Sequence, residues 1–500
     1  MKSEPIPSLP RSIVLVVSHS LSGHLAPMLR IAAALHNLCW NLFFLGPTAH
    51  ADKIAATGAT FLPLNGIADL DDRLYYQSPP VKGYNSLHWA ERVMLDFQHQ
   101  CLKPLPEQWQ AVKEALRTIR SKHPSCEVIV LAEAFFLGIM PLHYGASLGI
   151  GSEEPPAPLS RPKTLCISVT VPAIRSKDLP PAGYPFPFDP SPEGQERNAA
   201  LWRGWTRRSK KLTELLEAKM REAGATWPVN EVFLSGANYT CHNKILQLGV
   251  PSFEYPRSDW PSGFQFAGLV QGRPLPSLPP PAILNGKSPP FPWWAFLESN
   301  SSLPRESPQR KKVVVVSQGT VEINPQDLIL PTISAFTNHE DVIIVVILGW
   351  KGATLSLPSP GLDENDENAA MKTMPPNIFI ADYLNYDTVL AHSDAWVHNA
   401  GFGAVNHGIA NGVPMVVAGE GMDKTENARR VAQSGIGIDL GTATPTSQQL
   451  RVGIEHVLWD GAFARRVHEL SSESKAIDCF EVVHNELLVL TQTSRMTEGV

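Results

Sequence analysis

Two histidines and one glutamate stand where they could move a proton. The segment "SIVLVVSHSLSGHLAPMLRIAAAL" (12–35) is typical of a buried strand, a polar loop containing His24, and an amphipathic helix. Imidazole changes its charge near neutral pH, which suits a general base. Glu133 ends another strand-like run, "EVIVLAE", at the edge where parallel strands gather their ligand-binding ends. We therefore predict that Glu133 orients His24 as a base, whereas His19 at the strand end is structural.

A short glycine-rich turn in the C-terminal half could hold an anion. The run "DAWVHNAGFGAVNHGIANG" (394–412) predicts a strand that ends at about His398, a tight turn "NAGFGA", and a helix that stops at Gly412. Glycines before a helix N-terminus let backbone amides reach a phosphate, and the helix dipole favours negative charge there. The competing interpretation is a βα turn that needs glycine only for its backbone angles.

Strand-like and helix-like segments alternate along the chain, and this order positions both groups of residues. Short β-branched runs followed by helical patterns predict βαβ units and parallel sheets. In the first half the last predicted strands are "SFEYP" (252–256) and "FQFAGLV" (264–270), and the alternation restarts at "KKVVVVSQGT" (311–320). The chain therefore reads as two doubly wound, Rossmann-like α/β halves, which bind ligands outside the carboxyl ends of their strands.

A proline-rich stretch separates the two halves. Residues 271–310 contain ten prolines, which deny regular structure and predict a semi-rigid linker. We therefore expect an N-terminal domain at 1–270, the linker at 271–310, and a C-terminal domain at 311–460. The family resemblance described below implies that the N-terminal domain binds the acceptor and that the C-terminal domain binds the nucleotide sugar. We expect the helices at 461–500 to pack back toward the N-terminal domain.

Composition excludes several classes of protein. The 42 basic and 48 acidic residues give a net charge of −6 and form no runs, so we expect no nucleic-acid partner. Six cysteines without CxxC spacing argue against a zinc module and for a reducing compartment. The polar N-terminus predicts no signal peptide, and no apolar segment is long enough to predict a transmembrane segment. We expect a cytoplasmic protein.

One acidic run resembles a metal-binding motif only superficially. The residues "DLDD" (69–72) have no matching ligands and predict a solvated turn. No metal site is therefore predicted.

At full length, the glycine-rich segment resembles the donor-binding segment of the family 1 UDP-glycosyltransferases, and most closely their fungal and bacterial branch. That branch reads roughly NGGYGG, then GVP, then a DK or DQ pair, and this chain has "NAGFGA", Gly412–Pro414, and Asp423 with Lys424. "SQGT" (317–320) and "ADYLNYDTVLAHSDAWV" (381–397) are similar to further segments of the family, and the resemblance covers about residues 12–490. It implies the GT-B fold, in which two Rossmann-like domains face each other across a cleft.

The resemblance assigns roles to particular residues. Tyr383 takes the place of the tryptophan that stacks on uracil, a task for any flat aromatic ring. The diphosphate would be held by Asn399, by the amides of the glycine turn and by two hydroxyls. The sugar would meet the Asp423 and Lys424 side chains. The implied set is catalytic His24 and Glu133, with donor-binding Ser317, Thr320, Tyr383, Asn399, Gly401, Phe402, Gly403, Ala404, Asp423 and Lys424.

The chain also departs from the family's plant pattern. Asn399 replaces the diphosphate-binding histidine, and His407 stands at the position of the ribose-binding glutamate. Asn385 and Tyr386 stand where proline and glutamine are usual. Glu133 occupies a place that is commonly aspartate, one methylene shorter.

The resemblance implies an inverting glycosyltransferase of secondary metabolism that needs no cofactor and no metal. It would move a sugar, expected to be glucose, from a UDP-sugar to a hydroxyl of a small apolar acceptor. Loops at 66–100, 134–145 and 172–195 are rich in aromatic and aliphatic residues, which suits a phenolic, polyketide, terpenoid or lipid acceptor.

Two alternatives remain open on the sequence. A sugar-nucleotide epimerase can use the same two-domain architecture, but it would place acidic residues around the sugar. A non-catalytic nucleotide-sugar or lipid-binding protein is conceivable because positions 399 and 407 are replaced. Retention of His24, Glu133 and Asp423 argues against lost catalysis, and turnover of a UDP-sugar separates the three.

Overall fold

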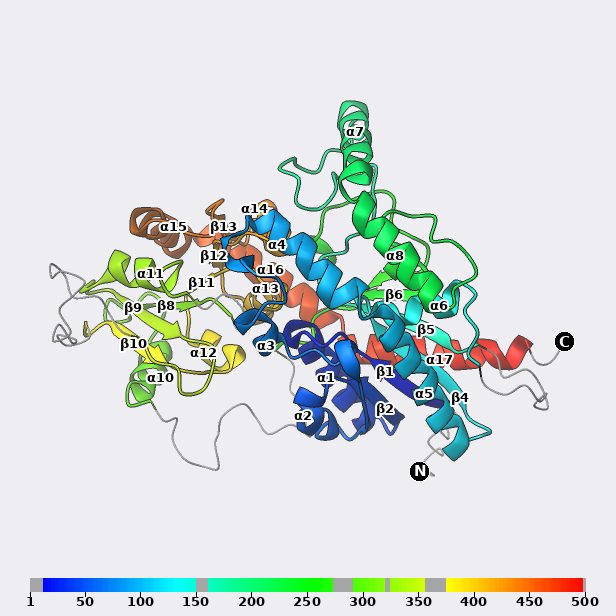
Figure 1. Ribbon diagram of the computed structural model, residues 1–500. Coiled ribbons are helices and arrows are strands. Elements are labelled where there is room, and N and C mark those ends of the chain that lie inside the picture. Colours follow the sequence, from blue (N-terminus) through cyan, green and yellow to red (C-terminus); the bar gives the residue numbers. More distant parts are fainter. Residues whose placement is uncertain (1–11, 150–160, 273–290, 320–323, 356–374, 498–500) are drawn as a thin grey trace, which may run out of the picture.

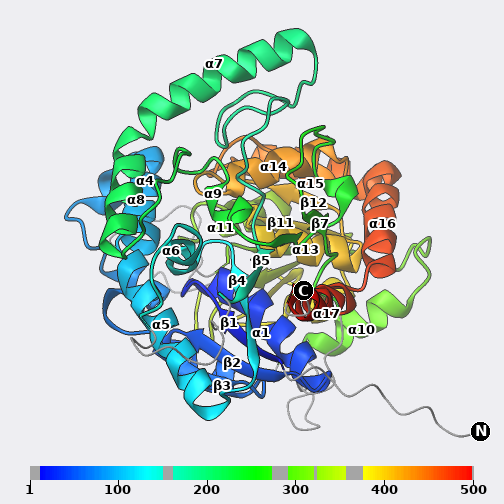
Figure 2. The same cartoon turned by 90° about the vertical axis from the view of Figure 1, so that its right-hand side faces the viewer.

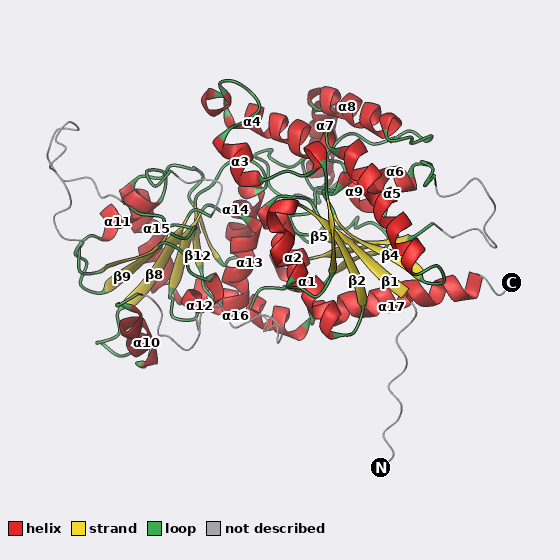
Figure 3. Cartoon of the chain, turned by 60° about the horizontal axis from the view of Figure 1, so that its bottom comes forward, coloured by secondary structure: helices red, strands yellow, loops and turns green. Residues whose placement is uncertain are grey.

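The computed structural model describes residues 12–149, 161–272, 291–319, 324–355 and 375–497. Figure 1 shows two α/β domains side by side, each built around one sheet. Figure 3 shows the two sheets as separate groups of strands with helices packed around them. In both sheets every neighbouring pair of strands is parallel.

The N-terminal sheet has the strand order β3-β2-β1-β4-β5-β6-β7. The order reverses between β1 and β4, which makes that pair the switch point where ligands bind in a doubly wound sheet. Its strands are β1 (Ser12–Val17), β2 (Asn41–Gly46), β3 (Thr60–Pro63), β4 (Glu127–Glu133), β5 (Lys163–Ser168), β6 (Lys244–Gln247) and β7 (Phe264–Phe266).

Helices cover both faces of this sheet. Val14 and Val16 of β1 pack against the first helix, whereas Ile13 and Leu15 pack against Trp109 on the opposite face. This alternation follows from the two-residue period of a strand. The helices of the domain are α1 (Ser22–Asn37), α2 (Ala51–Ala55), α3 (Asp72–Gln77), α4 (Trp89–Asp96), α5 (Leu105–Lys122), α6 (Met140–His143), α7 (Pro192–Arg208), α8 (Lys210–Glu222) and α9 (Ala237–Thr240).

The C-terminal sheet has the strand order β10-β9-β8-β11-β12-β13, with its switch point between β8 and β11. Its strands are β8 (Lys312–Ser317), β9 (Val342–Ile347), β10 (Ile378–Ala381), β11 (Ala395–His398), β12 (Met415–Val417) and β13 (Gly437–Asp439). The helices described after residue 290 are α10 (Trp294–Ser302), α11 (Ile329–Phe336), α12 (Tyr386–Leu390), α13 (Phe402–Asn411), α14 (Lys424–Gln433), α15 (Ser447–Trp459), α16 (Gly461–Ala476) and α17 (Cys479–Thr497).

The last helix crosses back to the first domain. Cys479, Val483 and Leu487 of α17 belong to the same buried cluster as α1 and the central strands of the N-terminal sheet. Figure 2 shows α17, in dark red, beside α1. Because these side chains are fully buried, α17 ties the two ends of the chain into one core.

A buried charge network joins the domains on another side. Arg430 of α14 donates hydrogen bonds from Nε to Glu254 Oε1 at 2.8 Å and to Oε2 at 2.9 Å. Its Nη1 donates to Glu426 Oε2 at 2.9 Å, and its guanidinium lies 4.5 Å from the centre of the Tyr255 ring. Glu426 Oε1 accepts from the backbone N–H of Gly183 at 2.9 Å.

The predicted α/β architecture is confirmed in both halves. The strand predicted at 252–256 is wrong, because a short helical turn at Pro251–Phe253 and then a loop occupy that segment. Residues 273–290 of the predicted linker lie outside the described residues. The expectation that prolines deny regular structure throughout 271–310 is wrong, because the helix α10 (Trp294–Ser302) forms in the second half of that segment. The expected domain boundaries stay a prediction. Among the helices that the structure describes, none combines the length and the apolar character that crossing a membrane requires.

Candidate active site

His24 and Glu133 both lie at the N-terminal switch point. Glu133 is the last residue of β4, and His24 is in the helix that follows β1. Val17 at the end of β1 pairs with Ala132, so Glu133 lies one residue beyond it at the carboxyl end of β4. His24 was expected in the loop after β1, but it lies in the first turn of α1, because that helix already begins at Ser22. A helical position fixes the backbone beneath the imidazole more firmly than a loop would.

The two side chains are in direct contact. His24 Nδ1 lies 2.9 Å from Glu133 Oε1, and Glu133 is fully buried whereas the His24 side chain is 17% exposed. The backbone N–H of Phe135 donates to the same oxygen at 3.0 Å, and the Phe135 ring meets the imidazole edge-on at 5.7 Å. With Nδ1–H directed at the carboxylate, Nε2 carries the lone pair that could accept a proton.

The electrostatics of the pair favour a basic imidazole. Burial alone would lower the pKa of His24, but the adjacent carboxylate of Glu133 outweighs burial, so the pKa lies above its ordinary value. Burial alone would raise the pKa of Glu133, but the contact with His24 keeps the pKa below its usual range. The charge of Asp423, from the C-terminal domain, also raises the pKa of His24.

His19 supports the site without being its base, in agreement with the role predicted for it. Its Nε2 lies 2.9 Å from the carbonyl of Gln100, and its Nδ1 accepts from the N–H of Leu21 at 3.1 Å. Burial and the neighbouring His24 lower the pKa of His19 to about 4, so the ring is neutral at physiological pH. Both of its nitrogens hold the loop that precedes α1.

The acidic run at 69–72 organises loops. Asp69 accepts hydrogen bonds from Thr48, and Asp71 accepts from the N–H of Arg73 at the start of α3. Asp72 is buried and accepts from the N–H of Ser22 at 2.8 Å, which anchors the first turn of α1. Asp72 therefore positions His24 indirectly, a role that the sequence analysis missed.

The glycine turn of the C-terminal domain forms the predicted helix N-terminus. Gly401 is the N-cap residue of α13, so no side chain caps the amides of the first turn. At its other end the helix stops at Gly412, which adopts the left-handed conformation. The amides of the first turn of a helix have no intrahelical partners and point outward. A Cβ added at Gly403 would meet no atom within 4 Å, so open space lies in front of this turn.

Asn399 is packed tightly into the turn before α13. Its Nδ2 donates to the carbonyl of Gln318, at the end of β8, at 2.6 Å. A Cβ added at Gly419 would lie 2.2 Å from the carbonyl oxygen of Asn399, so only glycine allows the β12–α14 loop to approach so closely. The position of Asn399 is thereby fixed from both sides.

Asp423 is held at the start of α14. Asn427, one turn further along, donates from Nδ2 to Asp423 Oδ2 at 3.0 Å and to the carbonyl of Ala400 at 2.8 Å. This buried amide links the two loops at the carboxyl ends of β11 and β12. Lys424 follows as the first residue of α14.

Comparison with known proteins places the chain in a family. Residues 361–490 match the family described as "Erythromycin biosynthesis protein CIII-like, C-terminal domain". The chain is 31% identical to UDP-glucosyltransferase 1 of Beauveria bassiana (strain ARSEF 2860), over 95% of this chain and 94% of that protein. The chain belongs to the family 1 UDP-glycosyltransferases. It is thus an enzyme that transfers sugar from a UDP-sugar donor.

One further relative agrees with this UDP-glycosyltransferase assignment, and one solved structure agrees with the fold. UDP-glucosyltransferase A1 of Starmerella bombicola is 29% identical over 97% of this chain and 92% of that protein. The crystal structure of the glycotransferase of kitacinnamycin shares the fold with a TM-score of 0.62 at 18% identity, covering 96% of this chain and all of that one. The GT-B fold predicted from the sequence is confirmed.

The remaining residues predicted to bind the donor lie in different settings. Tyr383 follows β10 and is 48% exposed, so its ring is accessible for stacking on a nucleobase. Ser317 is buried, and its Oγ accepts from Trp396 Nε1 at 3.1 Å, so the hydroxyl faces the sheet interior. Thr320 lies outside the described residues. The roles of all three toward the donor stay predictions.

The position of the family's ribose-binding glutamate carries an ion pair in this chain. His407 Nδ1 lies 2.6 Å from Asp387 Oδ1, which also accepts from Asn411 at 2.8 Å. Burial opposes ionisation of Asp387, but the contacts with His407 lower its pKa to about 2. Spacing could not predict this pair, because Asp387 and His407 lie on different helices.

Proposed function

We propose that this UDP-glycosyltransferase moves glucose from UDP-glucose to a hydroxyl of a small apolar acceptor, with inversion at the anomeric carbon. The observation that carries the proposal is the contact of 2.9 Å between His24 Nδ1 and Glu133 Oε1 at the switch point. Glucose as the sugar rests on the similarity to the relatives from Beauveria bassiana and Starmerella bombicola, which are named UDP-glucosyltransferases.

The base step follows from the tautomer of His24. The acceptor hydroxyl donates its proton to Nε2 while its oxygen attacks the anomeric carbon from the face opposite the diphosphate. The bond between that carbon and the diphosphate oxygen breaks, and UDP leaves with the electron pair. Attack on the opposite face inverts the configuration, and Glu133 stabilises the imidazolium that forms.

The departing UDP is stabilised by fixed dipoles. Its diphosphate would lie at the N-terminus of α13, where the amides of Phe402, Gly403 and Ala404 point outward. Asn399, held in place by Gln318, would add a side-chain contact. Preorganised donors of this kind offset the developing charge, and we propose that no metal is needed for the transfer.

An apolar acceptor fits the surroundings of His24. Phe135 packs against the imidazole, and Phe97 stacks on Phe135 at 6.3 Å. Trp89 and Val93 of α4 lie close to Gly421, in the loop that leads to Asp423. Apolar side chains beside the base, of which Phe135 is buried and Phe97 half-buried, suit a phenolic, polyketide, terpenoid or lipid body with one hydroxyl.

The proposal is tested by following transfer with the purified protein. UDP-glucose is incubated with a pooled panel of phenolic and lipid alcohols, and UDP release is measured with and without EDTA. We expect acceptor-dependent release that EDTA leaves unchanged, and a β-glucoside product by NMR because the donor is an α-glucoside. A product of retained configuration would overturn the mechanism, and loss of turnover with EDTA would overturn its independence of metals.

A further inference from the structure

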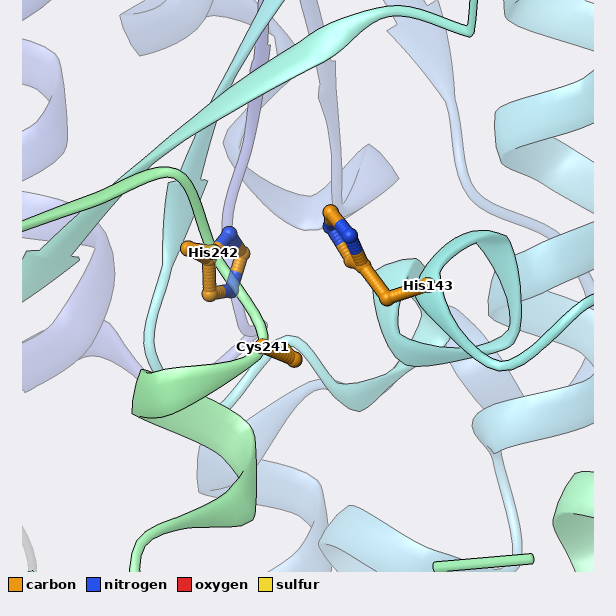
Figure 4. A group of neighbouring side chains, drawn as sticks. All are labelled: His143, Cys241 and His242. Atoms are coloured by element: carbon orange, nitrogen blue, oxygen red, sulfur yellow. The ribbon is translucent and has the colours of Figure 1, made fainter. Parts of the chain in front are cut away.

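Two histidines and a cysteine gather at the edge of the N-terminal sheet opposite the His24–Glu133 pair. His143 ends α6, and Cys241 and His242 directly follow α9. One nitrogen or sulfur atom from each residue lies within 4.8 Å of the other two. The centres of the two imidazole rings lie 5.4 Å apart, and the ring planes are tilted by 61°. Figure 4 shows the Cys241 side chain below and between the two rings.

The donor set is typical of a site for a borderline-soft divalent metal. Imidazole nitrogen and thiolate sulfur are the preferred ligands of Zn²⁺, and three protein ligands leave one tetrahedral position for water. Tetrahedral coordination places such ligand atoms about 3.3–3.6 Å apart.

His242 supplies a buried nitrogen that lacks a partner. The residue is 8% exposed, and its Nδ1 is buried without a hydrogen-bond partner in the described part of the chain. Buried polar atoms in native proteins are normally paired. A metal ion in the space beside Nδ1 would satisfy this atom.

His143 is already oriented by an outer contact. Its Nε2 lies 3.0 Å from Thr164 Oγ1, on the second residue of β5. Metal-binding histidines commonly use one ring nitrogen for the metal while the other is held by a hydrogen bond. Nδ1 of His143 is then the nitrogen that can face an ion.

We propose that His143, Cys241 and His242 bind one Zn²⁺ ion that stabilises the N-terminal domain. Binding replaces the S–H bond of Cys241 by a Zn–S bond and releases the proton to solvent. The ion would join α6 to the segment between α9 and β6, at the amino ends of β5 and β6. The His24–Glu133 pair lies at the carboxyl ends of the strands, on the opposite edge of the sheet. The ion would therefore contribute to stability and not to sugar transfer.

The test uses the full-length protein stripped of metal with EDTA and then dialysed. Titration with Zn²⁺ alone is followed by calorimetry, and titration with Co²⁺ by absorbance, since a cobalt–thiolate bond adds a charge-transfer band in the near ultraviolet. The variants are Cys241→Ser and His143→Gln, with Cys39→Ser as the matched control because Cys39 is exposed and lies elsewhere. Thr164→Val removes the outer contact while keeping all three ligands.

We expect one Zn²⁺ per chain, a higher Tm with Zn²⁺, and unchanged transfer activity. Cys241→Ser should lose the charge-transfer band and the Tm increase, whereas Cys39→Ser should keep both. Thr164→Val should weaken Zn²⁺ binding roughly 10–100-fold. Circular dichroism and transfer activity establish that the variants are folded. Absence of stoichiometric binding to the wild-type protein, or equal binding by folded Cys241→Ser, would overturn the site.

Discussion

The reactivity of His24 depends on which of its ring nitrogens carries the proton. The contact with Glu133 holds the proton on Nδ1 and leaves Nε2 free to act as a base. This pairing could be predicted from sequence, because both residues follow strands whose carboxyl ends meet at one sheet edge. The residues that hold the surrounding loop in place could not be predicted. Asp72 accepts a hydrogen bond from Ser22, 50 residues away, and the Gln100 carbonyl contacts His19, 81 residues away.

Replacing Glu133 by glutamine should change both the rate and the pH profile. The carboxylate raises the pKa of His24, so its loss should move the acidic limb of kcat/KM to lower pH. The rate should fall roughly 10²–10⁴-fold, because the amide neither fixes the tautomer nor stabilises the imidazolium. The measurement is kcat/KM for UDP release between pH 5 and pH 9, with the exposed Glu114→Gln as control. An unchanged acidic limb would refute the electrostatic coupling.

At the level of elements, the runs of β-branched residues predicted nearly every strand, because parallel strands are buried on both faces. The prediction of a strand at "SFEYP" was wrong, because a segment joins a sheet only where a neighbouring strand is available to pair with it. Its own composition does not decide this. Pro251 begins a helical turn there, and Glu254 then faces Arg430 of the other domain. Similarly, no spacing rule joins His143 to Cys241, which lie on separate elements.

The close approach of two loops in the donor half predicts the effect of Gly419→Ala. The new Cβ would lie 2.2 Å from the carbonyl oxygen of Asn399, so the turn before α13 has to shift. We expect the KM for UDP-glucose to rise roughly tenfold or more, and stability to fall by about 1–3 kcal/mol. Steady-state kinetics and thermal unfolding measure the two effects.

Gly204→Ala, in the middle of α7, serves as the control for that variant. Its Cβ would make only an ordinary contact of 3.8 Å with the Tyr184 hydroxyl, and alanine favours a helix. Donor KM should be unchanged in this variant. Equal kinetics for Gly419→Ala and Gly204→Ala would contradict the role assigned to the approach of the two loops.

For the whole molecule, the main feature is how α14 connects the domains. Asp423, at the proposed sugar site, is the N-cap residue of this helix. The helix carries Arg430, whose side chain is 4% exposed and pairs with the Glu254 side chain, which is 5% exposed. Burial opposes the charge on Arg430, but Glu254 and Glu426 keep its pKa above the ordinary value. The charge network therefore fixes α14 relative to the N-terminal domain.

Arg430→Ala should weaken both stability and donor binding. Removing one partner leaves Glu254 buried without its cation, which costs about 3–5 kcal/mol. Because α14 then loses its anchor on the other domain, the KM for UDP-glucose should rise as well. Calorimetric unfolding and steady-state kinetics test this expectation.

Arg451→Ala is the matched control for the charge network. It breaks the exposed helical pair with Glu455, whose side chains are 46% and 39% accessible, and such pairs contribute less than about 1 kcal/mol. If Arg430→Ala were no more destabilising than Arg451→Ala, the buried network would not be a structural link between the domains.

The role of His24 as the base is tested most directly by kcat for UDP release from UDP-glucose at a saturating concentration of an accepted alcohol. His24→Ala removes the proton acceptor but leaves the α13 turn and Asp423 in place. The predicted result is a kcat lower by roughly 10²–10⁴-fold with an unchanged Kd for UDP. A kcat close to that of the wild type, at equal UDP affinity, would contradict the assignment of His24 as the catalytic base.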